Sequence, residues 1–194
     1  MKFIPQAIPE IILIKSEVHN DKRGYFFETF HMDRFEKALG YKINFVQDNE
    51  SQSSKGVLRG LHFQIPPFAQ SKLVRVIQGS ILDVVVDIRK GSPNFGKHVV
   101  IEISDKNKYQ CFIPRGFAHG FVVLSEKAIL SYKVDNFYSP KHNRGIAYND
   151  IQLNINWRLP IEQIQISEQD LKQESLKGMP DYFNYKINYY NDDK

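Results

Sequence analysis

The chain has 194 residues, of which 42% are hydrophobic and 25% are charged, and its formal net charge is +4. This composition is typical of a globular domain and excludes a wholly disordered chain. The 26 lysines and arginines are scattered rather than clustered, so the charge predicts no nucleic-acid partner and fits an anionic small molecule. The lone cysteine, Cys111, excludes an intrachain disulfide framework and suits a reducing compartment.

The N-terminal segment "MKFIPQAIPEIILI" contains apolar residues but no signal-peptide core. Polar and imino residues at Pro5, Gln6, Pro9 and Glu10 interrupt it too early. No stretch reaches the roughly 18 apolar residues that a membrane span needs. The sequence therefore predicts a cytoplasmic protein that does not associate with a membrane.

Helix is scarce in the predicted elements, and short strands dominate. A first helix is predicted over residues 31–40, where Phe35 and Leu39 lie four apart and Gly40 suits a C-cap. The β-branched runs 72–79 and 80–91 read as a hairpin that turns near Gly79. Similar runs follow at intervals of roughly ten residues, the spacing of a sandwich or barrel, at 96–104, 109–114, 117–125 and 128–138.

A second, short helix is predicted to begin near Ser167, with Asp170 three residues on in the manner of a capping box. The last residues, 177–194, are rich in Tyr, Asn and Asp and lack clear periodicity. They predict an appendage of unknown role, either docked as a strand or disordered.

The stretch "RGLHFQ" concentrates polar groups within a predicted strand. Strict alternation of side chains would put Arg59 and Leu61 on one face and His62 and Gln64 on the other. Gly60 lies between the arginine and the histidine, and a glycine in a strand favours a bulge that re-aims one of its neighbours. The stretch therefore predicts either a polar rim on a barrel or half of an active site.

The segment "IPRGFAHGF" places His119 in the spacing P-x-G-x-x-H. Together with His62 this resembles the two-motif signature of the cupin superfamily, whose members are small jelly-roll barrels with a pocket in the mouth. In metal-binding cupins the first motif is H-x-H followed by a carboxylate, whereas this chain has Gln64 in the second position and Lys72 further on. An ammonium group repels a divalent cation and an amide is a poor replacement for imidazole, so the sequence predicts no metal.

Five motifs in order resemble those of the dTDP-4-dehydrorhamnose 3,5-epimerase family, from about residue 3 to residue 175. They are "RGYFFETF", the long segment at 45–93, "IPRGFAHGFVVLS", "YKVDNFYSP" and "ISEQD". The resemblance implies an all-β fold, a cupin-like jelly-roll barrel with a few short peripheral helices. It implies a single domain over residues 1–176, followed by the appendage at 177–194. It also implies a homodimer that exchanges N-terminal strands, which would cover exposed strand edges.

The same resemblance implies roles for individual residues. His62 matches the proton acceptor of the family, Tyr132 its proton donor and Asp170 the carboxylate that orients the histidine; Lys72 joins this catalytic set. Tyr138 matches the aromatic residue that stacks on the nucleotide base. The positions implied to bind substrate are Arg23, Glu28, Gln47, Asp48, Asn49, Arg59, Lys72, His119, Tyr138, Asn143 and Gln169. Two of these depart from the family, which commonly has an acidic residue near Asn143 and a lysine near Gln169.

The chemistry suits these residue types. In a 4-keto-6-deoxy sugar the ketone acidifies the protons on both C3 and C5, so inversion needs a base on one face and an acid on the other, with no redox cofactor. A histidine has a reference pKa of about 6.5 and a tyrosine one of about 10, which fits base and acid. Lys72 and His119 would face the enolate oxygen, and the guanidinium of Arg59 would grip the diphosphate.

The sequence thus predicts an isomerase that converts dTDP-4-dehydro-6-deoxy-D-glucose to dTDP-4-dehydro-L-rhamnose in dTDP-L-rhamnose biosynthesis. The alternatives are a mono-epimerase, a ketoisomerase on a related nucleotide sugar, and a barrel that binds a nucleotide sugar without catalysis. From the residues alone, Tyr132 is also compatible with a core tyrosine and Asp170 with a carboxylate that favours a helix dipole. The pair of His62 and Tyr132 favours the enzyme, because binding alone requires neither a base nor an acid.

Overall fold

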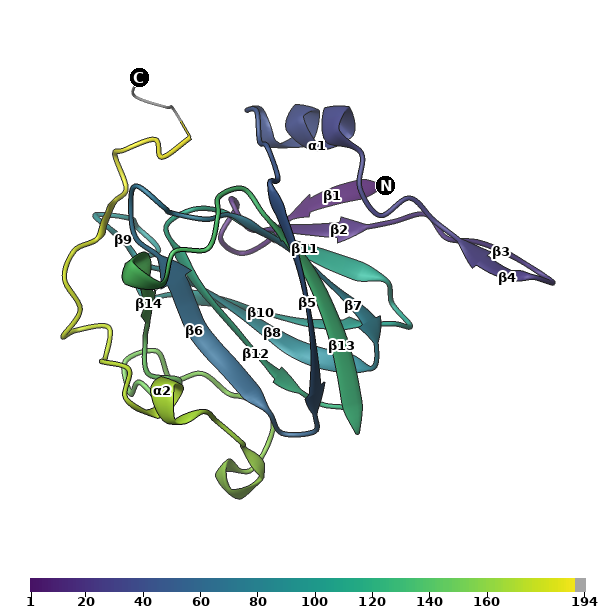
Figure 1. The fold of residues 1–194 in the computed structure, drawn as a ribbon. Helices are drawn as coiled ribbons and strands as arrows, with labels where there is room; N and C mark the ends of the chain where they lie inside the picture. The colour runs from purple at the N-terminus through teal and green to yellow at the C-terminus, as the bar shows by residue number, and fades with distance from the viewer. Residues whose placement is uncertain (191–194) are drawn as a thin grey trace.

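The structure, a computed structural model, describes residues 1–190 of the chain and consists mainly of two antiparallel sheets packed face to face (Figure 1). The six-stranded sheet has the order β1 (Lys2–Pro5), β2 (Ile12–Lys15), β11 (Tyr109–Ile113), β7 (Lys72–Gln78), β13 (Lys127–Val134) and β5 (Gln47–Ser54). The five-stranded sheet has the order β10 (His98–Ser104), β8 (Ser80–Asp87), β12 (Phe117–Val123), β6 (Leu58–Gln64) and β14 (Asn143–Gly145). Sheet neighbours that are far apart in sequence give a jelly-roll barrel, so the predicted all-β class is confirmed.

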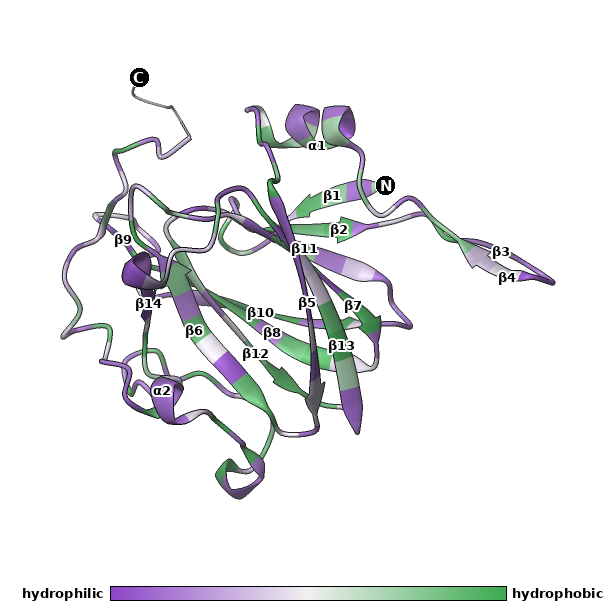
Figure 2. Ribbon diagram, in the orientation of Figure 1, coloured by the Kyte–Doolittle hydropathy of each residue, from purple (hydrophilic) through white to green (hydrophobic). Residues whose placement is uncertain are grey.

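Three apolar clusters stabilise this arrangement. The first fills the space between the sheets, with Val74 and Leu130 from one sheet facing Val85 and Phe121 from the other. The second covers the outer face of the five-stranded sheet with the segment that follows β14, which includes Trp157. Because β8 and β12 are covered on both faces, nearly all of their residues are buried, whereas β5 is hydrophilic, as Figure 2 shows.

The third cluster lies under helix α1 (Met32–Leu39), where Phe35 packs edge-on against Phe112 of the six-stranded sheet. The helix ends at Gly40, which has the left-handed conformation and donates its N–H to the carbonyl of Glu36. Helix α2 (Glu168–Leu171) begins after Ser167, whose hydroxyl accepts from the N–H of Asp170. Both predicted helices are therefore confirmed. Two short 3₁₀ turns complete the helical structure, η1 (Pro140–His142) and η2 (Ile161–Gln163).

The predicted hairpin at Gly79 is wrong, although the strands on either side of it are present. Strand β7 belongs to the six-stranded sheet and β8 to the five-stranded sheet, so the chain crosses from one layer to the other at this point. Gly79 has a φ of 81°, its N–H donates to Asp105, and Ser80 donates to Ser125 across the corner. Two successive β-branched runs have the same pattern in a hairpin and in a sandwich corner.

Two two-stranded ribbons lie outside the main sheets. Strands β3 (His19–Asp21) and β4 (Gly24–Phe26) form a hairpin that projects away from the body of the protein (Figure 1). Strands β9 (Arg89–Lys90) and β15 (Phe183–Asn184) pair in parallel, so the segment after residue 177 is docked on the barrel up to Tyr190. Within residues 1–190, no helix is long and apolar enough to cross a membrane.

Candidate active site

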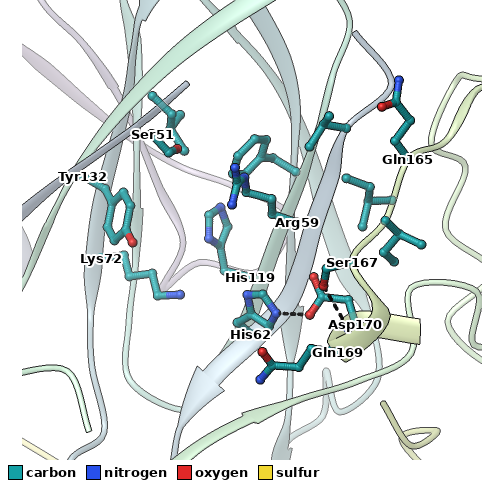
Figure 3. Close-up of a pocket in the computed structure, with 15 residues that line it drawn as sticks. Ser51, Arg59, His62, Lys72, His119, Tyr132, Gln165, Ser167, Gln169 and Asp170 are labelled. Atoms are coloured by element: carbon teal, nitrogen blue, oxygen red, sulfur yellow. Dashed lines mark hydrogen bonds and ion pairs between the residues drawn. The ribbon is translucent and has the colours of Figure 1, made fainter. Parts of the chain in front are cut away.

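A cavity of about 570 Å³ opens between the two sheets and is lined by polar side chains from both. Strand β6 contributes His62, β7 contributes Lys72, β12 contributes His119 and β13 contributes Tyr132, while α2 closes one side with Asp170 (Figure 3). These residues span more than a hundred positions of the sequence. The barrel therefore brings together these five polar groups, which the two motifs and the family resemblance singled out.

The neighbouring residues Arg59 and His62 both face the cavity because strand β6 bulges between them. In the pairing of β12 with β6, His119 lies opposite His62 and Phe121 lies opposite Arg59. The step is two residues on β12 but three on β6, so β6 contains one extra residue. Gly60 has a φ of 129°, and a Cβ there would meet the Cα of Gly120 at 2.4 Å. A glycine is therefore required at this point, and the predicted bulge is confirmed.

His62 is paired with Asp170 across 108 residues of sequence. Its Nε2 lies 2.6 Å from Oδ1 of the carboxylate, which is buried except for 6% of its side-chain surface. Burial acts to raise the pKa of Asp170, but the hydrogen bond from His62 and the N–H groups near it outweigh burial and lower that pKa. The carboxylate is ionised, so the imidazole donates through Nε2 and leaves Nδ1 free to accept a proton.

Tyr132 and Lys72 come from the six-stranded sheet and lie on the wall opposite His62 (Figure 3). Burial is the main cause that raises the pKa of the Tyr132 phenol, so the hydroxyl stays protonated at neutral pH. Burial lowers the pKa of the Lys72 ammonium to about 8, against an opposing attraction from Asp83. A largely charged lysine and a neutral phenol thus face a base across one cavity.

His119 has a carboxylate partner that the sequence analysis missed. Its Nε2 lies 2.6 Å from Oδ1 of Asp83, which is fully buried. Burial lowers the pKa of His119, and Asp83 opposes that shift. The other oxygen of Asp83 has no hydrogen-bond partner among residues 1–190. The signal for Asp83 was present in the sequence, because an aspartate within the β-branched run "SILDVVVD" is buried at a cost unless it is paired.

Two further predicted residues line the cavity near its rim. The Nε of Arg59 donates to the hydroxyl of Ser53 at 3.1 Å, and this contact leaves its Nη groups available for a ligand. Gln169 lies beside Asp170 on the same short helix. Ser51 and Gln165 also line the cavity and were not predicted.

Three predicted residues on β5 and one beyond β13 lie outside the lining. The amide of Gln47 donates to the side chain of Asn49 at 2.8 Å and accepts from the backbone N–H of Tyr138. Tyr138 itself is 56% exposed. Asp48 points the other way along the strand and pairs with Lys133 at 2.9 Å.

The last three predicted positions also lie outside the cavity lining. Arg23 lies at the tip of the projecting hairpin, where it pairs with Asp21, and its side chain is 84% exposed. Glu28 pairs with Arg34. Asn143 lies on β14, opposite Gln64, and does not line the cavity.

Gln64 holds a loop rather than facing the cavity. Its buried amide donates to the carbonyls of Phe68 and Phe137 and accepts from the N–H of Ser139. The side chain thereby fixes the segment that carries Tyr138. Among residues 1–190, no three His, Cys, Asp or Glu side chains are grouped so as to hold a metal ion.

Comparisons with known proteins agree on one family. The family model described as dTDP-4-dehydrorhamnose 3,5-epimerase matches residues 5–178. A protein of that description from Shigella flexneri is 48% identical over 183 residues, which cover 94% of this chain and 99% of that protein. A dTDP-4-dehydrorhamnose 3-epimerase from Streptomyces niveus is less similar, at 34% identity over 170 residues, which cover 88% of this chain and 82% of that protein.

Solved structures give the same result. The crystal structure of a dTDP-6-deoxy-D-glucose-3,5-epimerase from Legionella pneumophila, in complex with dTDP-4-keto-L-rhamnose, superposes with a TM-score of 0.92. The two sequences are 44% identical, and the superposition covers 96% of this chain and 99% of that one.

Proposed function

The chain belongs to the dTDP-4-dehydrorhamnose 3,5-epimerase family, and we propose that His62 and Tyr132 perform its two proton transfers. The protein is an isomerase that inverts C3 and C5 of dTDP-4-dehydro-6-deoxy-D-glucose, giving dTDP-4-dehydro-L-rhamnose, in dTDP-rhamnose biosynthesis. The observation that supports these roles best is the placement of the His62–Asp170 pair and Tyr132 on opposite walls of one cavity.

The proton balance follows from this placement. The free Nδ1 of His62 accepts a proton from the carbon next to the ketone, and the electron pair of the broken C–H bond passes to the ketone oxygen as an enolate. Tyr132 then gives its phenolic proton to the opposite face of that carbon. The imidazolium formed on His62 is stabilised by Asp170 at 2.6 Å, and solvent restores both groups for the next inversion.

Lys72 is the group that we assign to the enolate oxygen. With a pKa of about 8, its ammonium is largely protonated at neutral pH and can donate to the developing negative charge. The Nε2 of His119 is engaged by Asp83, so His119 is left to shape the wall beside the sugar. No cofactor is needed, because no electron leaves the substrate.

The remaining substrate contacts follow from charge and exposure. Arg59 lines the cavity with free Nη groups and suits the diphosphate. Tyr138 presents an exposed ring on the loop held by Gln64 and Gln47, which suits stacking on the nucleotide base. The neutral amides of Asn143 and Gln169 suit sugar hydroxyls rather than a charged group.

The projecting hairpin supports a homodimer. Phe26 is 74% exposed and Tyr25 is 57% exposed on β4, and both large rings would be covered by a second copy of the chain. Arg23 lies on this hairpin and Glu28 lies two residues after it, and neither lines the cavity of its own subunit. In a dimer that exchanges these strands, they would reach the cavity of the partner. We place this activity in the cytoplasm, with no nucleic-acid partner.

A labelling experiment tests the reaction against its alternatives. dTDP-4-dehydro-6-deoxy-D-glucose is incubated with the protein in D2O, without added cofactor, and the sugar is followed by NMR. A 3,5-epimerase leaves deuterium at C3 and C5 and inverts both. A 3-epimerase, the activity named for the relative from Streptomyces niveus, inverts C3 alone. A ketoisomerase moves the carbonyl, and a silent binding barrel labels nothing above the control without enzyme, which would refute the proposed mechanism.

A further inference from the structure

The C-terminal segment ends, as far as the structure describes it, against the back of the active site. The family match stops at residue 178, whereas the chain continues along the barrel. Phe183 is buried in the cluster over the five-stranded sheet, and Tyr189 packs edge-on against it. These contacts carry the segment to Tyr190, whose ring lies 4.3 Å from that of Tyr41, centroid to centroid.

The hydroxyl of Tyr190 links the side chain of Ser71 to the backbone of Arg115. It lies 2.7 Å from the hydroxyl of Ser71, a residue with no exposed surface, and it accepts from the N–H of Arg115 at 2.9 Å. Asp135 completes the cluster, because it accepts from the N–H of Ser71 and pairs with the guanidinium of Arg115 at 3.1 Å. The guanidinium of Arg115 also donates to the backbone carbonyl of Tyr189, so Arg115 binds the C-terminal segment through both its backbone and its side chain.

This cluster lies where three strands that carry active-site groups begin or end. Ser71 immediately precedes Lys72, the first residue of β7. Asp135 follows the last residue of β13, the strand of Tyr132, and Arg115 lies in the turn before β12, the strand of His119. The backbone of Lys72 pairs with Ile113 of β11 and Val134 of β13, and Ser71 lies just before the strand, at the end that carries Lys72.

We propose that Tyr190 is a positioning residue of the active site, whose hydroxyl fixes Ser71 and thereby holds the Lys72 ammonium group in the cavity. The inference rests on the proposed role of Lys72. The phenol lies outside the cavity lining and acts through the hydroxyl of Ser71, one residue before Lys72. A shift of about 1 Å in a reacting group is enough to slow an enzyme up to a hundredfold, so loss of one such contact affects the rate.

The test compares two phenylalanine variants of the same segment. Tyr190→Phe removes the hydroxyl from the cluster, and Tyr189→Phe is the matched control, because its hydroxyl accepts from the N–H of Asn184 within the segment. We expect kcat for dTDP-4-dehydro-6-deoxy-D-glucose to fall about tenfold in Tyr190→Phe with KM nearly unchanged, and to stay at the wild-type value in Tyr189→Phe. Equal kcat in both variants would overturn the proposal.

Two further measurements separate positioning from general destabilisation. Lys72 lines the cavity with His119 and Tyr132; burial lowers its pKa to about 8, and the attraction of the buried Asp83 opposes this shift. If Tyr190→Phe lets the ammonium move toward water, the basic limb of kcat/KM shifts to higher pH, whereas Tyr189→Phe leaves it in place. In addition, Ser71→Ala combined with Tyr190→Phe should be no slower than either single variant. An unmoved limb, or additive losses, would count against positioning.

A Lys72→Met variant tests the role of Lys72 separately from the positioning role of Tyr190. If Lys72→Met is nearly inactive and Tyr190→Phe is normal, the positioning role fails and the role of Lys72 stands. If Lys72→Met keeps wild-type kcat, the proposed role of Lys72 fails, and the inference falls with it.

Discussion

Nε2 of His62 lies 2.6 Å from Oδ1 of Asp170, although 108 residues of sequence separate them. The carboxylate lies in the first turn of α2, where the hydroxyl of Ser167 accepts from the N–H of Asp170. The backbone N–H of Asp170 therefore takes part in the N-terminal cap of the helix, while its side chain binds the histidine. The helix start sets the position of the carboxylate, and the carboxylate sets the tautomer of the imidazole.

His62→Asn should remove the base without unfolding the barrel. Asparagine is close in shape to histidine and keeps polar atoms at the cavity wall, but it accepts no proton at neutral pH. We expect kcat to fall by roughly 10²–10⁴-fold, the usual contribution of a general base. Steady-state kinetics with a circular dichroism control check this, and near-normal turnover in a folded variant would exclude His62 as the base.

Asp170→Asn should impair the same step more mildly. The amide keeps the size of the carboxylate but cannot stabilise the imidazolium, and it allows the imidazole to adopt the wrong tautomer. We expect a loss within the range for His62→Asn but at its lower end, about 10²-fold, with KM little changed. Asp170→Asn added to His62→Asn should cost nothing further in kcat. An additional loss would mean that the carboxylate acts on the substrate directly.

Tyr132→Phe should separate proton removal from inversion. The variant keeps the ring and loses only the transferable proton, while the His62–Asp170 pair is untouched. We expect the substrate to exchange a C–H with D2O through His62 at a measurable rate while little inverted product forms. NMR of the recovered sugar reads both quantities. A parallel decline of exchange and inversion would show that the phenol does something other than protonate the far face.

The sequence was a better guide to the strands and the motif residues than to their partners. The runs at 96–104 and 109–114 form strands because their apolar residues are buried in the core of the barrel, and this pattern is visible in the sequence. The crossing at Gly79 depends on which sheet receives β8, and local pattern carries no information on that choice. Strand β5 reads "QDNESQSS" and has no strand composition; it forms because β13 pairs with it along its whole length. Asp83 was overlooked as the partner of His119 for the same reason, since pairing is a tertiary fact.

The pH dependence of the reaction should report Lys72. Burial lowers its pKa to about 8, and the protonated form is the active one, so kcat/KM should fall as pH rises through that value. The pKa of Tyr132 is raised above its ordinary value of 10, so the phenol does not titrate in this window. Lys72→Arg keeps its charge at every working pH and should lose the basic limb. A limb that persists in Lys72→Arg would assign it to another group.

Mixing two inactive variants should restore activity if the projecting hairpin completes the cavity of a partner subunit. Arg23→Ala removes the exposed guanidinium at the hairpin tip, and His62→Asn removes the base inside the barrel. In a mixed dimer, the subunit with Arg23→Ala keeps its own His62 and receives Arg23 from the other subunit, so one of the two cavities is intact. Random reassociation makes half of the dimers mixed, so about a quarter of wild-type activity should return. Sizing should show a dimer for each variant alone. If a dimer forms and mixing restores nothing, Arg23 does not act across the interface, and a monomer at micromolar concentration would contradict the dimer itself.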